Sequence, residues 1–247
     1  MKIRIGASLA AITLVLAGCG DSGGGDLNAA TGNNAAPLAQ IAAPDNGDWA
    51  EMVSETPEGG IRMGNPDAPV KLVEYASMTC PHCAAFSRDA SESLRETYVR
   101  SGQVSWEFRN FVMNAPDMAM AALSRCQPPA AFFRTIDQLF AQQQELMTAI
   151  DEAEEARLRD LPPEQLITPL ARAMDLDTFF ARRGMPEARF NECLADTEAL
   201  QRLTDGTNRA VTQEQVQGTP SFFINGQRQD ASDWRMLEPR LRAAIGG

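Results

Sequence analysis

Three consecutive stretches near the middle of the chain show strand-like, helix-like and again strand-like patterns. Residues 70–76 are mostly apolar, which predicts a strand in a sheet covered on both faces. Residues 81–97 place Phe86 and Leu94 on one face at helical spacing. Residues 104–112 alternate apolar and polar side chains, as a strand does. This order predicts two parallel strands joined by a right-handed crossover.

The second half of the chain changes from helical to strand-like patterns. Residues 116–209 hold several short apolar helical faces separated by Pro and Gly, which predicts a block of helices. Strand character returns over residues 221–226, and Asn225-Gly226 is a strong hairpin signal. Residues 227–230 would form a short returning strand, and residues 234–245 a final helix. The predicted order is β-α-β, a helical insertion, then β-β-α.

The first 17 residues have the pattern of a bacterial export signal. Lys2 and Arg4 precede an apolar stretch that is too short, and wrongly flanked, for a membrane span. The stretch ends in Leu16-Ala-Gly-Cys19, which resembles a lipoprotein signal. That resemblance implies a signal peptide over residues 1–18 and a lipidated Cys19 at the mature N-terminus. The alternative is an ordinary signal cleaved nearby, in which Cys19 is removed or has no role.

The segment that follows has no hydrophobic periodicity. Residues 19–61 are rich in Gly, Ala, Asn, Asp, Ser and Pro, which predicts a flexible tether. About 45 such residues would span roughly 35–40 Å r.m.s., enough to hold a domain clear of a membrane surface. The remainder, residues 62–247, suits one domain with a helical insertion at about 116–209.

The chain is acidic, with 33 Asp and Glu against 22 Lys and Arg and a net charge of −11. Removing Lys2 and Arg4 with the signal would bring the net charge near −13. A chain this acidic is a poor nucleic-acid binder. No segment after residue 17 has the pattern of a membrane span, so we expect contact with a membrane only through a lipid on Cys19.

Cys80-Pro81-His82-Cys83 follows the first predicted strand and begins the first predicted helix. A cysteine at a helix N-terminus has its thiolate stabilised by free backbone N–H groups, and the imidazolium of His82 would add to this. A haem site of the c type needs histidine directly after the second cysteine, where Ala84 stands. A structural zinc site needs four ligands, and the chain has no second motif to supply them. The motif therefore favours redox chemistry over a purely structural disulfide, with no metal.

Two further cysteines, Cys126 and Cys193, stand alone in segments predicted to be helical. An even number of cysteines in an oxidising compartment favours a second disulfide between them. The alternative is a pair of buried free thiols, which pack as small apolar residues.

The predicted order of elements, together with the cysteine motif, resembles the thioredoxin fold with a helical insertion. The most similar family is that of the DsbA-like thiol:disulfide oxidoreductases. The likeness covers about residues 62–245 and rests on Cys-Pro-His-Cys together with Gly218-Thr-Pro-Ser-Phe-Phe-Ile-Asn-Gly226. It implies that Cys80 is the exposed attacking cysteine and Cys83 the buried resolving one. Pro81 and His82 would tune the potential.

The resemblance also assigns residues outside the motif. Pro220 would be cis and would leave the backbone of Thr219 free to pair with an extended substrate; an ordinary trans proline is the alternative. Glu74, a charged residue in an apolar strand, would be a buried acid that takes or returns the proton of Cys83. A glutamate at the surface edge of the sheet is the alternative for Glu74.

The expected function is a periplasmic dithiol oxidase that introduces disulfides into exported proteins, with the Cys80–Cys83 pair as its only redox group. The resemblance implies a membrane quinone-linked thiol oxidase as recycling partner. No dimerisation domain is evident, so we expect a monomer. Thr219 is typical of reductase and isomerase relatives, which keeps that direction open. A binding or chaperone module with a structural disulfide and a cysteine-based metal carrier are the remaining alternatives.

Overall fold

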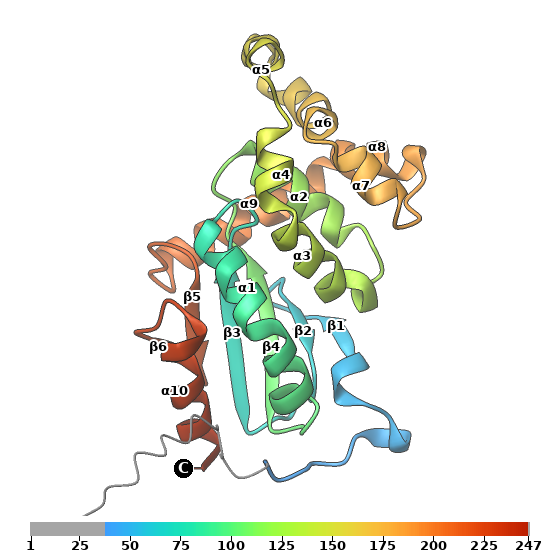
Figure 1. Ribbon diagram of the computed structural model, residues 1–247. Helices are drawn as coiled ribbons and strands as arrows, with labels where there is room; N and C mark the ends of the chain where they lie inside the picture. The colour runs from blue at the N-terminus through green and yellow to red at the C-terminus, as the bar shows by residue number, and fades with distance from the viewer. Residues whose placement is uncertain (1–37, 247) are drawn as a thin grey trace, which may run out of the picture. The chain divides into compact units, whose positions relative to one another are not determined.

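The computed structural model describes residues 38–246, apart from the side chains of residues 163 and 164. The predicted signal peptide, Cys19 and residues 19–37 of the predicted tether lie outside this range and stay predictions. The described chain is organised around a six-stranded mixed sheet with the strand order β1-β2-β4-β3-β5-β6 (Figure 1). The two longest strands, β3 and β4, lie at its centre.

The predicted β-α-β unit is present. β3 (Val70–Ala76) and β4 (Val104–Asn110) are parallel, with Leu72 opposite Trp106. Between them α1 (Pro81–Ser93) continues into a π-helical segment (Leu94–Val99) and lies across the sheet (Figure 1). Burial of its apolar stripe, which is worth about 25 cal/mol per Å² of apolar surface, holds α1 on the sheet.

The predicted second half of the sheet is also present. β5 (Ser221–Ile224) pairs antiparallel with β3, and β6 (Gln227–Gln229) pairs antiparallel with β5. The turn between β5 and β6 uses Asn225 and Gly226, whose φ values of 50° and 78° suit a tight hairpin. The final helix, α10 (Trp234–Gly246), packs against α1 and β3.

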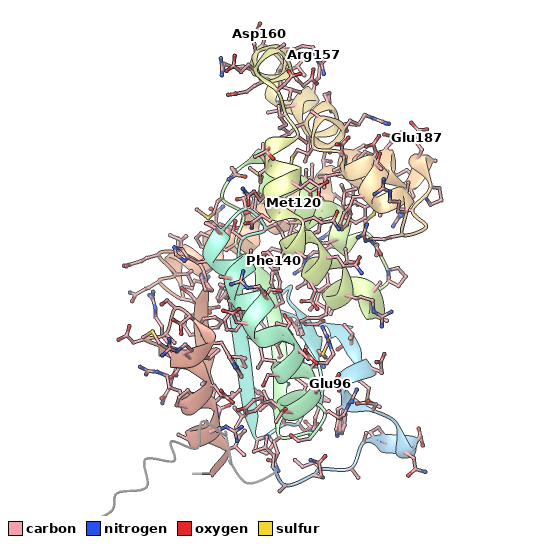
Figure 2. The ribbon with its side chains drawn as sticks, in the orientation of Figure 1. Glu96, Met120, Phe140, Arg157, Asp160 and Glu187 are labelled. Atoms are coloured by element: carbon pink, nitrogen blue, oxygen red, sulfur yellow. A yellow bond between two sulfur atoms is a disulfide. The ribbon has the colours of Figure 1, made fainter. Side chains whose placement is uncertain are left out.

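The helical insertion extends from α2 to α9 and gathers beyond the carboxyl ends of β3 and β4 (Figure 1). Its helices are α2 (Ala115–Arg125), α3 (Phe132–Ala141), α4 (Gln143–Thr148), α5 (Glu152–Arg159), α6 (Pro163–Ala173), α7 (Leu176–Ala181), α8 (Glu187–Ala195) and α9 (Thr197–Thr212). Met120 and Phe140 are buried between these helices, whereas Arg157 and Asp160 lie at the outer end of the insertion (Figure 2). Within residues 38–246, no helix combines the length and the apolar character that crossing a membrane requires.

The prediction of a flexible tether is wrong over residues 38–61, because these residues belong to the folded domain. β1 (Val53–Glu55) pairs with β2 (Ile61–Met63), and β2 pairs with β4. Trp49 is buried, and its Nε1 donates to the carbonyl of Ile41 at 2.9 Å. The pairing with β4 stabilises these edge strands, and strands of three residues are too short to show periodicity in the sequence.

Side chains cover both faces of the central strands, as predicted, but to different extents. One face packs against α1 and α3, where Trp106 and Phe133 have ring centroids 4.7 Å apart. The other face packs against α9 through a smaller cluster that includes Tyr75 and Phe223. The redox motif follows β3 directly, so the better-packed face holds the start of α1 in place.

A disulfide joins Cys126 at the end of α2 to Cys193 in α8, with the Cα atoms 5.9 Å apart. The pairing predicted from the cysteine count is therefore present. It closes a loop with a sequence separation of 67 residues and fastens two helices of the insertion together. In the chain-entropy account, closing a loop of this length stabilises the folded state by about 4 kcal/mol.

Replacing both Cys126 and Cys193 by alanine is expected to lower the free energy of unfolding by up to about 4 kcal/mol. Denaturant unfolding of the oxidised wild type and the double variant measures the difference. Oxidation of a dithiol peptide should be largely retained, because the redox pair lies elsewhere. Alkylation of both Cys126 and Cys193 in freshly isolated native protein would contradict the prediction.

Candidate active site

The Cys80-Pro-His-Cys83 motif lies where β3 ends and α1 begins. Cys80 is the residue before the first helical turn, and Pro81 takes the first helical position, where its missing N–H costs nothing. Pro81 and His82 are exposed. Both cysteines are free thiols in the structure. Cys80 is 9% exposed and Cys83 is fully buried, so Cys80 is the more accessible thiol, although less exposed than the sequence predicted.

The surroundings of Cys80 favour its thiolate. They lower its pKa from 9.0 to about 5: a hydrogen bond from the side chain of Cys83 contributes most, burial opposes it, and the Thr219 side chain and the backbone N–H groups of Cys83 and His82 add to it. As a thiol, Sγ of Cys80 instead donates to the carbonyl of Thr219 at 3.2 Å, which opposes ionisation. The several donors to the thiolate outweigh this one bond to the thiol.

The residues predicted to bind substrate lie beside Cys80. The Thr219–Pro220 peptide bond is cis, as the resemblance implied. The Thr219 carbonyl points at Sγ of Cys80, and its hydroxyl donates weakly to Sδ of Met113 at 3.8 Å. Met113 is 58% exposed. A large exposed apolar side chain next to a reactive thiol offers a contact for a substrate chain.

Cys83 has the opposite environment. Burial, the hydrogen bond to Cys80 and the charges of Cys80 and Glu74 raise its pKa far above the usual value for a thiol. Cys83 therefore stays protonated while Cys80 is a thiolate. For Cys83 to attack a mixed disulfide at Cys80, its proton must first be transferred to another group.

Glu74 is buried inside the domain rather than at the edge of the sheet. It is 1% exposed, and Nε1 of Trp106 donates to its Oε2 at 3.0 Å. Burial raises its pKa from 4.5 to about 8, and the hydrogen bond from Trp106 opposes that rise. The alternative of a surface glutamate is excluded. A carboxyl with a pKa close to neutrality, in electrostatic contact with Cys83, has the properties of a proton carrier.

Two residues of the insertion hold the active-site loop, and the sequence did not single them out. Nε2 of Gln143 in α4 donates to the carbonyls of Met78 at 2.8 Å and Cys80 at 3.0 Å. Asp117 in α2 accepts from the backbone N–H groups of Met78 at 2.8 Å and Met113 at 2.9 Å. Both side chains are buried. Nothing in a lone Gln or Asp within a predicted helix distinguishes such a role.

Replacing Gln143 by leucine is expected to lower the free energy of unfolding by about 2 kcal/mol, because two buried carbonyls lose their donor. The redox potential of the Cys80–Cys83 pair should also change, since the loop that carries Cys80 is released. Denaturant unfolding and equilibration with glutathione measure the two effects. Gln144→Leu, at the exposed neighbouring position, is the matched control and should leave both quantities unchanged.

Ultraviolet titration of the reduced protein is expected to show thiolate formation near pH 5. Because this pKa is below the unfolded value, the thiolate stabilises the reduced folded protein above the unfolded pKa. That contribution is lost as the pH falls through about 5. His82→Ala keeps the backbone N–H that stabilises the thiolate, so any rise in the midpoint measures the contribution of the ring. A wild-type midpoint near 8.5 would refute the assignment.

Comparisons with known proteins agree with this geometry. A family model described as thioredoxin matches residues 56–241, more than half of the chain. A Rickettsia bellii protein, whose name describes a protein-disulfide oxidoreductase, is 25% identical over 76% of this chain and 65% of its own length. A similar Rickettsia felis protein is 27% identical over 66% of this chain and 52% of its own length. The chain thus spans about half to two thirds of these curated relatives.

Solved structures give the same result. The crystal structure of a protein-disulfide isomerase from Novosphingobium aromaticivorans is 31% identical, with a TM-score of 0.71, and the match covers 75% of this chain and 97% of that one. Wolbachia pipientis alpha-DsbA1 shares the fold at 20% identity and a TM-score of 0.62, over 80% of this chain and 96% of that one. The chain therefore belongs to the thioredoxin family, and it shares the fold of a DsbA protein.

Proposed function

We propose that this protein is a dithiol oxidase of exported proteins and works in the bacterial periplasm. The observation that carries the proposal is the environment of Cys80, which lowers its pKa to about 5. Stabilising the thiolate stabilises the reduced enzyme and makes its disulfide a stronger oxidant. Two pKa units between about 5 and neutral pH correspond to roughly 3 kcal/mol, or roughly 60 mV for two electrons.

In the proposed reaction a substrate thiolate attacks Sγ of Cys80 in the Cys80–Cys83 disulfide. A bond forms between the substrate sulfur and Sγ of Cys80, the Cys80–Cys83 bond breaks, and Cys83 leaves and takes up a proton. A second substrate thiolate then attacks the substrate sulfur of the mixed disulfide, and Cys80 leaves as a thiolate. The substrate dithiol is oxidised to a disulfide, and the enzyme disulfide is reduced to the dithiol. Glu74 supplies the proton to Cys83 and takes it back when the pair is reoxidised.

Thr219 and Met113 are the proposed contacts for the substrate chain. The backbone of Thr219 adjoins Sγ of Cys80, so an extended substrate that pairs with it would present its cysteine to the reactive sulfur. Met113 adds an exposed apolar contact. We expect exported proteins with free cysteines as substrates, a membrane quinone-linked thiol oxidase as recycling partner, and a monomeric enzyme.

The test is the redox potential of the Cys80–Cys83 pair, measured by equilibration with glutathione buffers. An oxidase is expected to have a potential above about −200 mV. A potential below about −300 mV would mark a stable structural disulfide and support a non-catalytic binding module instead.

A reductase or isomerase is the second candidate, and two observations favour it. The Novosphingobium protein, 31% identical, is titled a protein-disulfide isomerase, and Thr219 is the residue type seen in such relatives. Trapping mixed disulfides in cells with a Cys83→Ala variant separates the directions. For a dithiol oxidase, the variant is expected to capture newly exported proteins and a membrane oxidase. Capture mainly of a membrane reductase and already oxidised proteins would favour the second candidate.

The location is proposed from the N-terminal sequence. Leu16-Ala-Gly-Cys19 supports lipidation of Cys19, and residues 19–37 would then form the tether between the lipid and the folded domain. Mass spectrometry of the mature N-terminus is expected to find lipid on Cys19. A soluble form cleaved at another position would refute the anchor while leaving the proposed redox reaction untouched.

A further inference from the structure

A cleft of about 760 Å³ opens between the turn that joins β1 to β2, the carboxyl ends of β3 and β4, and helix α9. Cys126 and Cys193 form part of its wall, so the disulfide fixes one side of the cleft. Its volume lies within the range of small-molecule sites in proteins. None of Cys80, Cys83 and Glu74 lines it, and the proposed redox reaction does not use it.

Charged side chains dominate the lining of the cleft. Five arginines contribute to it, together with five carboxylates. Several of the carboxylates are already engaged: Glu214 pairs with Arg109 at 3.0 Å, and Asp196 accepts from the backbone of Ala199 at the start of α9. Three of the arginines are paired with carboxylates, whereas Arg125 and Arg209 form no ion pair within residues 38–246. Arg209 donates to the backbone carbonyl of Glu58 at 3.4 Å, so Arg125 is the one considered further.

Arg125 ends α2 and is partly buried. Its Nε donates to Oδ1 of Asn110 at 2.6 Å. Among the residues that the structure describes, it forms no ion pair, and its two terminal nitrogens make no hydrogen bond, although the charges of Glu55 and Glu107 act on it. Burial lowers its pKa to about 10, which leaves the guanidinium charged at neutral pH. A charged guanidinium thus lines the cleft with both terminal nitrogens free of hydrogen bonds.

Asn110 is a second, independent sign of a missing partner. It ends β4, is 6% exposed and lines the cleft. The bond from Arg125 identifies Oδ1, so the other atom of the amide is Nδ2, which is buried without a hydrogen-bond partner. Buried amide nitrogens without an acceptor are rare in folded proteins, and each calls for an explanation such as an unfilled ligand position.

We propose that this cleft binds a small molecule through an oxyanion, a carboxylate or a phosphate, held by Arg125 with Asn110 as the second donor. The planar guanidinium presents paired N–H donors that match two oxygens of such a group. Asn110 supplies a further N–H from the strand beside it. Arg189 and Arg209, at exposed positions of the lining, add attraction at longer range.

The charge of the whole protein makes the test selective. A net charge of −11 repels anions in general, so saturable binding would have to come from a local site. Titrating the full exported protein with inorganic phosphate, and separately with glutarate, is expected to give a dissociation constant of about 1 mM or lower for one of them. The anion that binds more tightly distinguishes a phosphate site from a carboxylate site.

Variants locate the binding. Arg125→Gln is expected to lower the affinity for the more tightly bound anion about tenfold or more, because one charge-assisted contact is lost. Arg159→Gln removes an exposed arginine of α5 and should leave the affinity unchanged. Equal affinity in the Arg125→Gln protein would overturn the proposal, as would the absence of saturable binding in the wild type.

Nuclear magnetic resonance of the wild type keeps the test decisive if Arg125→Gln does not fold. The Arg125 Nε and Asn110 Nδ2 resonances are expected to shift together and saturate with the same dissociation constant as the titration. If other resonances shift and saturate while those of Arg125 Nε and Asn110 Nδ2 do not move, the anion binds to another part of the protein and the site is refuted. Neither measurement depends on the redox state of Cys80, so failure here is distinguishable from failure of the proposed oxidase.

Discussion

Replacing Cys83 by alanine is expected to abolish turnover and also to make Cys80 a weaker acid. Without Cys83 the enzyme cannot form the disulfide that a substrate thiolate attacks. A mixed disulfide formed at Cys80 during reoxidation would also persist, because Cys83 is absent to resolve it. The acidity falls because the hydrogen bond from Cys83 is the largest contribution to the low pKa of Cys80. Thiolate titration of the variant should therefore give Cys80 a pKa well above the value of about 5 expected for the wild type, nearer that of an ordinary thiol.

Cys83→Ser is the matched control for this prediction. A serine hydroxyl still donates a hydrogen bond but cannot form a disulfide, so the variant should lose turnover while its Cys80 keeps most of its acidity. Cys80→Ala should lose turnover and form no mixed disulfide at all, since the remaining thiol is buried with a raised pKa. Equal Cys80 midpoints in the alanine and serine variants would contradict the role given to Cys83.

Glu74→Gln is expected to stabilise the protein at neutral pH and to slow its chemistry. The folded-state pKa of Glu74 is raised from 4.5 to about 8. Folding therefore costs free energy from this group as the pH rises from about 4.5 to 8 and the unfolded carboxyl ionises. At pH 7 the cost is up to about 3 kcal/mol, and glutamine removes it while keeping an acceptor for Trp106. The gain in stability should vanish below pH 4.5.

The measurement is denaturant unfolding of wild type and Glu74→Gln at pH 4 and pH 8. Glu92→Gln, an exposed position in α1, is the control and should show no pH-dependent gain. Resolution of mixed disulfides by Cys83 should slow by about 10²-fold, because a positioned proton acceptor is lost. If the stabilities of wild type and Glu74→Gln run parallel from pH 4 to pH 8, Glu74 does not titrate as described.

The sheet and the reactive pair were predictable because each has a local signal. The apolar run of β3, the spacing of Phe86 and Leu94, and Asn225-Gly226 each identify an element without knowledge of the rest. Cys80-Pro-His-Cys83 combines two thiols with a helix start. Cys126 and Cys193 were predicted to pair because they remain once the motif is set aside.

Other features depend on neighbours that are distant in sequence and were missed. β1 and β2 are three residues long and are strands because β4 offers its edge to β2. Gln143 and Asp117 hold the active-site loop across 65 and 39 residues of sequence, and no local pattern distinguishes a side chain that donates to or accepts from a distant buried loop. Whether Glu74 is buried or exposed could not be predicted for the same reason, because only its packing against Trp106 excludes a surface position.

The dependence of the active-site loop on the helical insertion has a consequence for the order in which the enzyme matures. Synthesis proceeds from the N-terminus, so Cys80 and Cys83 emerge well before Gln143, and before the Thr219 that adjoins Cys80. Until the insertion docks and the last strands pair, the partners that complete the thiolate environment are absent. A half-emerged chain would carry two thiols of more ordinary reactivity, and the low pKa of Cys80 would appear only with the finished domain.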